Sequence, residues 1–248
     1  MVALLIKLCR GFPHWIRNGL RYSRMNRSGT FRITRRDLAY YTYQRYNSAG
    51  SLDCGYFHQD LWAARIVFAR RIKELVDVGS RLDGFVAHVI PFCHVQCLDI
   101  RPPPVSTPGL TFVQADAAKM PFADNSVDAL SCLHVIEHIG LGRYGDPVDP
   151  EGYLHVAREF CRVIKPGGIL LLGTPVGQER LCFDAHRVFD PQTIADAFGK
   201  LRLIEFSLID DAGMGVTANA SFEVARKCRT GCGLFLFEKS AAVSPRIV

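Results

Sequence analysis

Three aspartates follow one another along the chain at intervals that suit the binding of a nucleoside. Asp77 comes just before a glycine-containing loop, Gly79–Gly84, and Asp99 follows Asp77 by 22 residues. A carboxylate at this interval can accept hydrogen bonds from both hydroxyl groups of a ribose. Asp116, further along, can accept one from an adenine amino group. Each aspartate alone could be a capping or turn residue, but the three together predict a nucleoside site.

The second glycine of a dinucleotide-binding loop is replaced here by Arg81. That glycine lets the backbone approach a pyrophosphate, so Arg81 argues against a nicotinamide-dependent oxidoreductase, which stays as the less favoured alternative. A nucleoside ligand without a pyrophosphate does not need this approach, and S-adenosylmethionine is such a ligand. Arg81 could pair with the carboxylate of its amino-acid tail or could be a surface arginine, and the sequence leaves both open.

The segments that must position these residues alternate between strand-like and helix-like patterns. Short apolar runs predict strands, and apolar residues at three- and four-residue steps predict helices. The alternation predicts an α/β fold with a doubly wound, mostly parallel sheet, whose ligands lie at the carboxyl ends of the strands. The expected strands cover residues 74–80, 95–101, 110–117, 127–136, 168–176, 201–210 and 233–239. The expected helices cover residues 59–74, 83–90, 151–165 and 191–199.

Several of these segments resemble the successive motifs of class I S-adenosylmethionine-dependent methyltransferases. The motifs are "ELVDVGSRLDG", "QCLDI", "MPFADNSVDALSCLHVIEHI" and "RVIKPGGILLLGTPVG", and the third is similar to the small-molecule, type 11-like subgroup. More narrowly, "HQDLWAAR" and "DAHRVF" resemble an uncharacterised methyltransferase-like family, a domain of unknown function. The resemblance covers residues 59–240. It implies a seven-stranded, Rossmann-like methyltransferase sheet in which the last strand is antiparallel.

The resemblance also implies a role for each residue near the expected strand ends. The glycine loop would contact the cofactor tail, the second aspartate the ribose, and the third aspartate the adenine. The residues that end the fourth strand would line the methyl side. The cofactor-binding residues that we predict are Asp77, Gly79, Ser80, Arg81, Gly84, Asp99, Ile100, Asp116, Ala117, Leu133 and His134.

Methyl transfer from a sulfonium is an in-line displacement, so the protein must align the acceptor and, for some acceptors, remove a proton. Alignment can lower the barrier by about 7–11 kcal/mol, and a base adds about 10²–10⁴-fold. Histidine suits the second task because its pKa lies near neutrality. We predict Glu137, His138 and His186 as catalytic residues, although each could instead have a structural role.

A polar loop rich in glycine and proline, Gly140–Gly152, follows the fourth expected strand and could act as a lid or as a rigid connector. As a lid, the loop would bring its own Arg143 and Tyr144 to the acceptor. Arg143, Arg187 and the basic N-terminal residues together favour an anionic acceptor, either a small molecule or a glycan. A nucleic-acid acceptor is disfavoured because the strand ends in "CLHVIEH" and not in an Asn-Pro-Pro-Tyr-type motif. A second alternative is a catalytically silent protein that uses this fold for interactions.

The N-terminal residues carry the whole positive balance of the chain. Residues 1–46 hold ten of the 30 Lys and Arg residues but one of the 24 Asp and Glu residues, with aromatic residues between them. Such an arm could bind an anionic surface such as a membrane, or it could be a solvated or partly disordered extension. The first apolar residues, "MVALLIKLC", are too few to span a bilayer. We therefore expect a peripheral membrane contact, if any.

The 248 residues suit one domain with extensions: a basic N-terminal extension over residues 1–58, a methyltransferase-like domain over 59–240 and a tail over 241–248. Nine scattered cysteines without a paired spacing predict free thiols in a reducing compartment and no metal site. We expect a cytoplasmic protein, or one that is peripheral at the membrane. The sequence does not predict the oligomeric state.

Overall fold

The computed structural model describes residues 2–29, 31–42, 44–46, 54–103 and 106–241. Contacts divide the chain into two units, Met1–Leu52 and Asp53–Val248, and each is described by itself. Most of the expected tail, residues 242–248, lies outside the described residues. The first helix of the larger unit, α2, begins at Cys54, ahead of residue 59.

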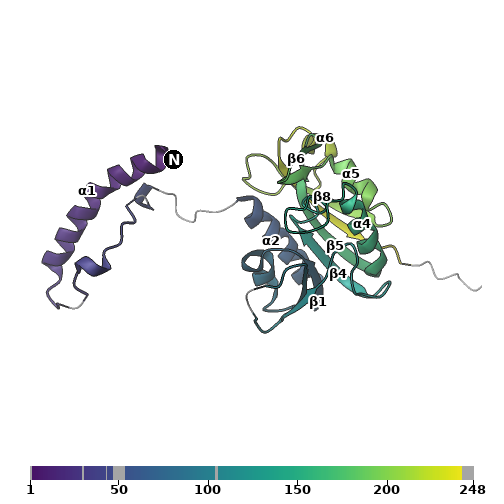
Figure 1. Ribbon diagram of the computed structural model, residues 1–248, viewed down its shortest axis with the longest axis horizontal. Coiled ribbons are helices and arrows are strands. Elements are labelled where there is room, and N and C mark those ends of the chain that lie inside the picture. The colour runs from purple at the N-terminus through teal and green to yellow at the C-terminus, as the bar shows by residue number, and fades with distance from the viewer. Residues whose placement is uncertain (1, 30, 43, 47–53, 104–105, 242–248) are drawn as a thin grey trace, which may run out of the picture. The chain divides into compact units, whose positions relative to one another are not determined.

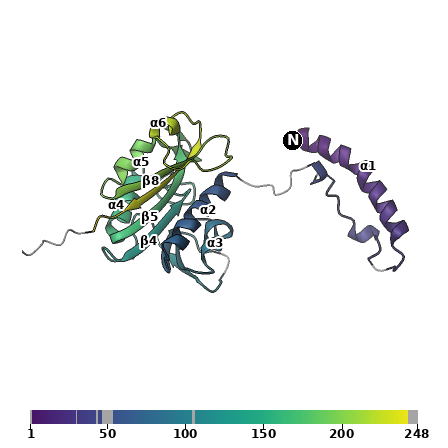
Figure 2. The same cartoon turned by 180° about the vertical axis from the view of Figure 1, so that it is seen from behind.

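The larger unit is built on a seven-stranded sheet with the order β3-β2-β1-β4-β5-β9-β8 (Figures 1 and 2). β9 pairs antiparallel with both β5 and β8, whereas the pairs among β1 to β5 are parallel. The predicted fold class and the antiparallel last strand are therefore confirmed. The strands are β1 Glu74–Val78, β2 His94–Asp99, β3 Leu110–Gln114, β4 Val127–Leu133, β5 Ile164–Val176, β8 Arg202–Ile209 and β9 Gly231–Glu238.

Helices cover both faces of this sheet, because its central strand β5 is apolar on both sides. Leu170 of β5 packs in a core with Phe160 of α4, whereas Leu171 packs on the opposite face with Trp62 of α2. The helices of the unit are α2 Cys54–Ala69, the π-helical turn Leu82–Val86, α3 Ala87–Val89, α4 Gly152–Val163, α5 Pro191–Ala197 and α6 Phe222–Ala225. A hairpin outside the main sheet consists of β6 Arg180–Cys182 and β7 His186–Val188.

Two local expectations were wrong, each for a backbone reason, and one hairpin was missed. The helix expected over 83–90 is broken, because Gly84 has φ −108° and ψ −116° and leaves only a π turn and a short α3. The strand expected to reach residue 136 ends at Leu133, because His134 adopts a left-handed φ of 56°. The β6–β7 hairpin was missed because three residues per strand give too little pattern to detect.

The smaller unit consists of α1, Val2–Met25, and a return segment that contains the 3₁₀ turns Arg35–Asp37 and Gln44–Tyr46. The long helix was not among the expected elements. Trp15 Nε1 donates to the carbonyl oxygen of Ala39 at 3.0 Å, and the Tyr46 hydroxyl donates to that of Arg10 at 3.0 Å. These bonds hold the return segment on the helix. None of the described helices is long and apolar enough to cross a membrane.

Candidate functional site

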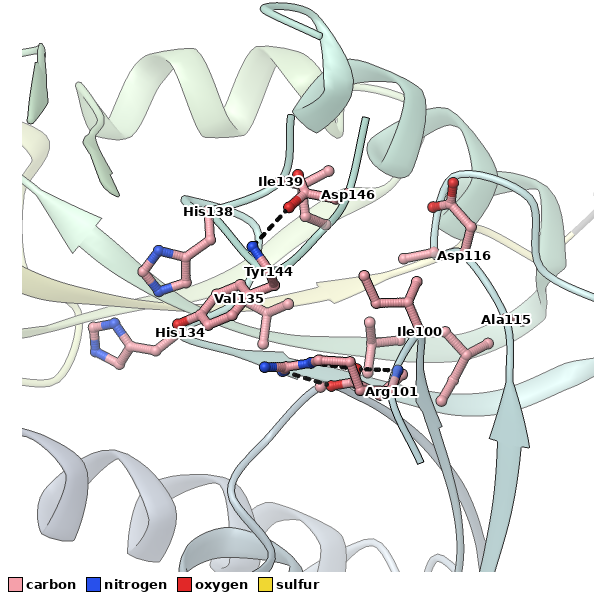
Figure 3. A pocket seen from close by; sticks show the side chains of 15 residues that line it. Ile100, Arg101, Ala115, Asp116, His134, Val135, His138, Ile139, Tyr144 and Asp146 are labelled. Atoms are coloured by element: carbon pink, nitrogen blue, oxygen red, sulfur yellow. Dashed lines mark hydrogen bonds and ion pairs between the residues drawn. The ribbon is translucent and has the colours of Figure 1, made fainter. Parts of the chain in front are cut away.

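A cleft opens at the carboxyl ends of β1, β2, β3 and β4, where the strand order reverses between β1 and β4. Figure 3 shows Asp116 at one end of it, His134 and His138 at the other, and Arg101 between them. Seven of the predicted site residues line the cleft, namely Gly79, Asp99, Ile100, Asp116, Ala117, His134 and His138. The other seven do not, namely Asp77, Ser80, Arg81, Gly84, Leu133, Glu137 and His186.

The carboxylate of Asp99, predicted to hold a ribose, is bound by an arginine two residues further on. Arg101 donates its backbone N–H at 2.8 Å and its Nε at 3.2 Å to Asp99 Oδ1, and its Nη2 at 3.2 Å to Oδ2. The Arg101 guanidinium in turn lies 4.4 Å from the ring centre of Tyr144, in the loop Gly140–Gly152. Arg101 and Tyr144 therefore cover the middle of the cleft, and sequence reasoning missed Arg101.

Asp77 lies beneath the cleft and is fully buried. Its carboxylate accepts hydrogen bonds from the hydroxyls of Ser131 at 2.6 Å and Ser80 at 2.7 Å. Burial raises the pKa of Asp77 to about 6, against the opposing effect of these two hydrogen bonds. Because the side chain faces β4 and not the cleft, Asp77 supports the glycine loop from below. The three aspartates therefore do not all face one ligand.

The glycine loop directs Arg81 away from the cleft. Its guanidinium donates to both carboxylate oxygens of Asp83, at 3.1 and 3.0 Å, and lies 5.5 Å from the ring centre of Tyr56. Gly79 has a φ of 64°, and a Cβ there would come within 3.1 Å of Val135. The arginine at the second glycine position thus leaves the cleft open.

Helix α2 adds a buried polar group that sequence reasoning missed. Gln59 and Asp60 are almost fully buried, and Gln59 Nε2 donates to Asp60 Oδ1 at 3.4 Å. Asp60 also explains why residue 84 is a glycine, because a Cβ at that position would lie 2.5 Å from Asp60 Oδ2. Burial raises the pKa of Asp60. The signal was in the sequence, since two adjacent polar residues precede the buried Trp62 in an otherwise apolar helix.

At the other end of the cleft, His134 forms a buried ion pair with Glu137. His134 Nδ1 lies 2.8 Å from Glu137 Oε1, and Thr174 donates to the other carboxylate oxygen at 3.4 Å. Burial alone would lower the pKa of His134, but Cys232 and Glu137 together raise it well above its usual value. Both partners therefore favour the protonated form of the His134 ring.

His138 has the geometry of a base. Its Nδ1 lies 2.7 Å from the carbonyl oxygen of Ala185, so Nδ1 carries the hydrogen and Nε2 of the neutral ring keeps a lone pair. Nε2 lies 3.8 Å from Glu137 Oε1, which can stabilise the ring when it gains a proton. The ring of His186 stands 6.5 Å away from that of His138, and burial lowers the pKa of His186.

The loop Gly140–Gly152 is folded around Asp146. The carboxylate of Asp146 accepts from the backbone N–H groups of Gly140 at 2.7 Å, Tyr144 at 3.2 Å and Gly142 at 3.3 Å. Arg187 donates to the carbonyl oxygens of Ile139 and Pro150 on either side of the loop. Arg187 thus holds the loop and is not among the residues that line the cleft, so it gives no support to an anionic acceptor.

Comparisons with known proteins agree with the sequence resemblance. A family model described as "Caenorhabditis protein of unknown function, DUF268" matches residues 114–218. An uncharacterized methyltransferase of Mycobacterium avium is 29% identical over 141 residues, which cover 53% of this chain and 51% of the relative. The chain spans about half the length of the curated relatives that it matches first.

Solved structures share the fold at low sequence identity. The N-methyltransferase NodS from Bradyrhizobium japonicum, in complex with S-adenosylhomocysteine, has a TM-score of 0.52 and 14% identity, covering 73% of this chain and 85% of NodS. The [4+2]-cyclase SpnF has a TM-score of 0.50 and 15% identity, covering 73% of this chain and 82% of SpnF. This chain therefore shares its fold with a methyltransferase, NodS, and with a cyclase, SpnF.

Proposed function

We propose that the protein transfers a methyl group from S-adenosylmethionine to a small-molecule or glycan-type acceptor. The observation that carries this proposal is the cleft, which is lined by Asp99 and Asp116, the carboxylates predicted to bind a nucleoside, and by His138, whose Nε2 keeps a lone pair. The relatives named uncharacterized methyltransferases support the same activity.

The residues of the cleft fit this cofactor. Asp116 and Ala117 would hold the adenine, Asp99 the ribose, and Gly79 the start of the amino-acid tail. Arg81 is the residue that could prevent this cofactor from fitting, because its side chain would block the glycine loop if it faced the cleft. It pairs with Asp83 instead. When bound, the cofactor supplies an electrophilic methyl group on a sulfonium.

The residues at the other end of the cleft would orient the acceptor and handle its proton. His138 Nε2 accepts the proton, and Glu137 stabilises the imidazolium that results. His134, whose ring bonds both Glu137 and Cys232, holds the Glu137 carboxylate in place beside His138. Tyr144, stacked on Arg101, excludes water from the cleft.

Calorimetric titration with S-adenosylhomocysteine tests the cofactor assignment. We expect binding by the wild-type chain and a loss of affinity of about tenfold or more in Asp99→Ala, because a ribose would lose a charged hydrogen-bond acceptor. The control is Asp128→Ala, which removes the same charge from an exposed carboxylate outside the cleft and is expected to leave affinity unchanged. Equal affinity of Asp99→Ala and wild type would overturn the ribose assignment.

The alternative is a catalytically silent protein, and one observation favours it: Asp99 is already bonded to Arg101. If the protein is catalytically silent, no heat of binding appears at about 1 mM S-adenosylhomocysteine.

A parallel titration with NAD⁺ tests the alternative of a nicotinamide-dependent oxidoreductase, and we expect no binding. For the enzyme, a labelled methyl group on the cofactor is expected to appear on an acceptor from a small-molecule and glycan panel.

A further inference from the structure

The helix α1 has three distinct faces, and one of them is already used inside the smaller unit. That face contacts the return segment: the carbonyl oxygen of Leu8 accepts from the hydroxyl of Thr42 at 3.3 Å, and the Tyr22 hydroxyl donates to the carbonyl oxygen of Phe31 at 3.1 Å. Gly11 lies on the same face, where a Cβ would come within 2.1 Å of the Thr42 carbonyl oxygen. The return segment therefore covers this face of the helix.

The second face is apolar and exposed. Phe12, Ile16 and Leu20 stand at successive four-residue steps, and 45%, 43% and 56% of their surfaces are exposed. The return segment adds Phe31 and Ile33, which are exposed by 84% and 47% and line a shallow groove beside this stripe. Contiguous apolar surface of this kind marks a binding site.

The third face is basic. The sequence of α1 contains five Lys and Arg residues and no Asp or Glu. By helical spacing, Arg17, Arg21 and Arg24 lie on the side of the apolar stripe away from the packed face. A partner that matches both faces must therefore present an apolar strip beside a negatively charged strip.

We propose that α1 lies in the surface of an anionic lipid bilayer, with Phe12, Ile16 and Leu20 inserted and the arginines among the headgroups. A bilayer surface offers an apolar layer beside a layer of negative charge, which matches the two free faces of the helix. A nucleic acid would use the arginines but would leave the apolar stripe in water. The proposal does not depend on methyl transfer.

Sedimentation of the full chain with lipid vesicles tests this proposal. We expect binding to vesicles that mix phosphatidylcholine with phosphatidylglycerol, weaker binding to phosphatidylcholine alone, and weakening by salt. The triple variant Phe12→Ser, Ile16→Ser, Leu20→Ser keeps every charge, and we expect it to bind anionic vesicles about tenfold or more weakly. The matched control Phe68→Ser, Leu181→Ser, Met214→Ser alters three exposed apolar residues of the larger unit and is expected to bind as the wild type does.

Three outcomes would overturn the proposal. The triple variant could bind anionic vesicles as tightly as the wild type, which would indicate adsorption through charge alone. The wild type could fail to bind them at low salt while binding a DNA duplex. The wild type could form a dimer that the triple variant loses, with no vesicle binding, so that a second copy covers the stripe. A second variant, Arg21→Glu with Arg24→Glu, keeps the apolar stripe and must also lose binding, so the test does not depend on whether the triple variant retains α1.

Discussion

Glu137 gives two nearby histidines different chemistry. With Cys232 it raises the pKa of His134, whose Nδ1 lies 2.8 Å from its carboxylate, whereas His138 is fixed through its Nδ1 by the Ala185 carbonyl oxygen and keeps its Nε2 free. The two histidines therefore have different partners within a single cleft. The sequence predicted that His134, Glu137 and His138 would gather after the fourth strand, but which of them could accept a proton depends on contacts with distant segments.

Asp77 leads to a prediction about stability and pH. Its pKa is about 6 in the folded protein and 3.8 as the ordinary value, so the folded state holds its proton to higher pH than the unfolded chain does. The free energy of unfolding should therefore fall by up to about 3 kcal/mol as pH rises from about 4 to about 6. Asp77→Asn, which stays neutral, removes this fall.

Urea unfolding at pH 4.5 and pH 7 measures the difference between the two proteins. Asp83→Asn is the control, because Asp83 is exposed and has its pKa lowered by Arg81. If Asp77→Asn loses as much stability as the wild type between these pH values, the buried carboxyl group does not titrate in this range.

At the residue scale, the sequence predicted which acids stand near the cleft but not where each side chain points. The interval from Asp77 to Asp99 depends only on the lengths of a strand and a crossover, and a periodic pattern predicts both. The direction of Asp77 depends on Ser131 of β4, 54 residues away, and the state of Asp99 depends on Arg101 and on Tyr144 of the loop. Such long-range contacts leave no periodic signal.

At the scale of elements, the loop Gly140–Gly152 depends on one carboxylate. Asp146→Ala removes the carboxylate that accepts hydrogen bonds from three backbone N–H groups of the loop. We therefore expect faster amide hydrogen exchange at Gly140, Gly142 and Tyr144. Because Tyr144 then no longer holds Arg101, affinity for S-adenosylhomocysteine should also change. Hydrogen-exchange mass spectrometry over residues 139–152 provides the measurement.

The control for this loop is Asp128→Ala, an exposed carboxylate of β4 that pairs with Lys165 on the surface. Unchanged exchange in Asp146→Ala would mean that Arg187, which bonds the loop at both ends, is enough to hold it.

Most strands were predicted because the apolar runs are long and bounded by turn residues, as in β5. The elements that were missed lack such a signal. The β6–β7 hairpin has three residues in each strand, and α1 carries so many arginines that its apolar stripe occupies a minority of its surface. The end of β4 was misplaced because no pattern predicts a left-handed backbone at a histidine.

For the whole molecule, the division into two units predicts that their properties separate. The larger unit contains both cores of the sheet and the whole cleft. A chain that starts at Cys54 should unfold cooperatively and bind S-adenosylhomocysteine with an affinity within about twofold of the full chain. The same chain should not sediment with anionic vesicles.

Calorimetry and vesicle sedimentation on the shortened chain measure the two properties in one sample. Loss of S-adenosylhomocysteine binding from a folded shortened chain would show that the smaller unit contributes to the cleft. Vesicle binding by the shortened chain would move the membrane contact away from α1.

The position of β9 has a consequence for how the chain is made. β9 lies between β5 and β8, although it is synthesised after both. While a nascent chain emerges from the ribosome, β5 and β8 each expose an edge toward the same empty space, and no earlier segment fills it. The seven-stranded sheet is therefore complete only after Glu238 has been added. A chaperone that shields strand edges would act on this protein late in translation.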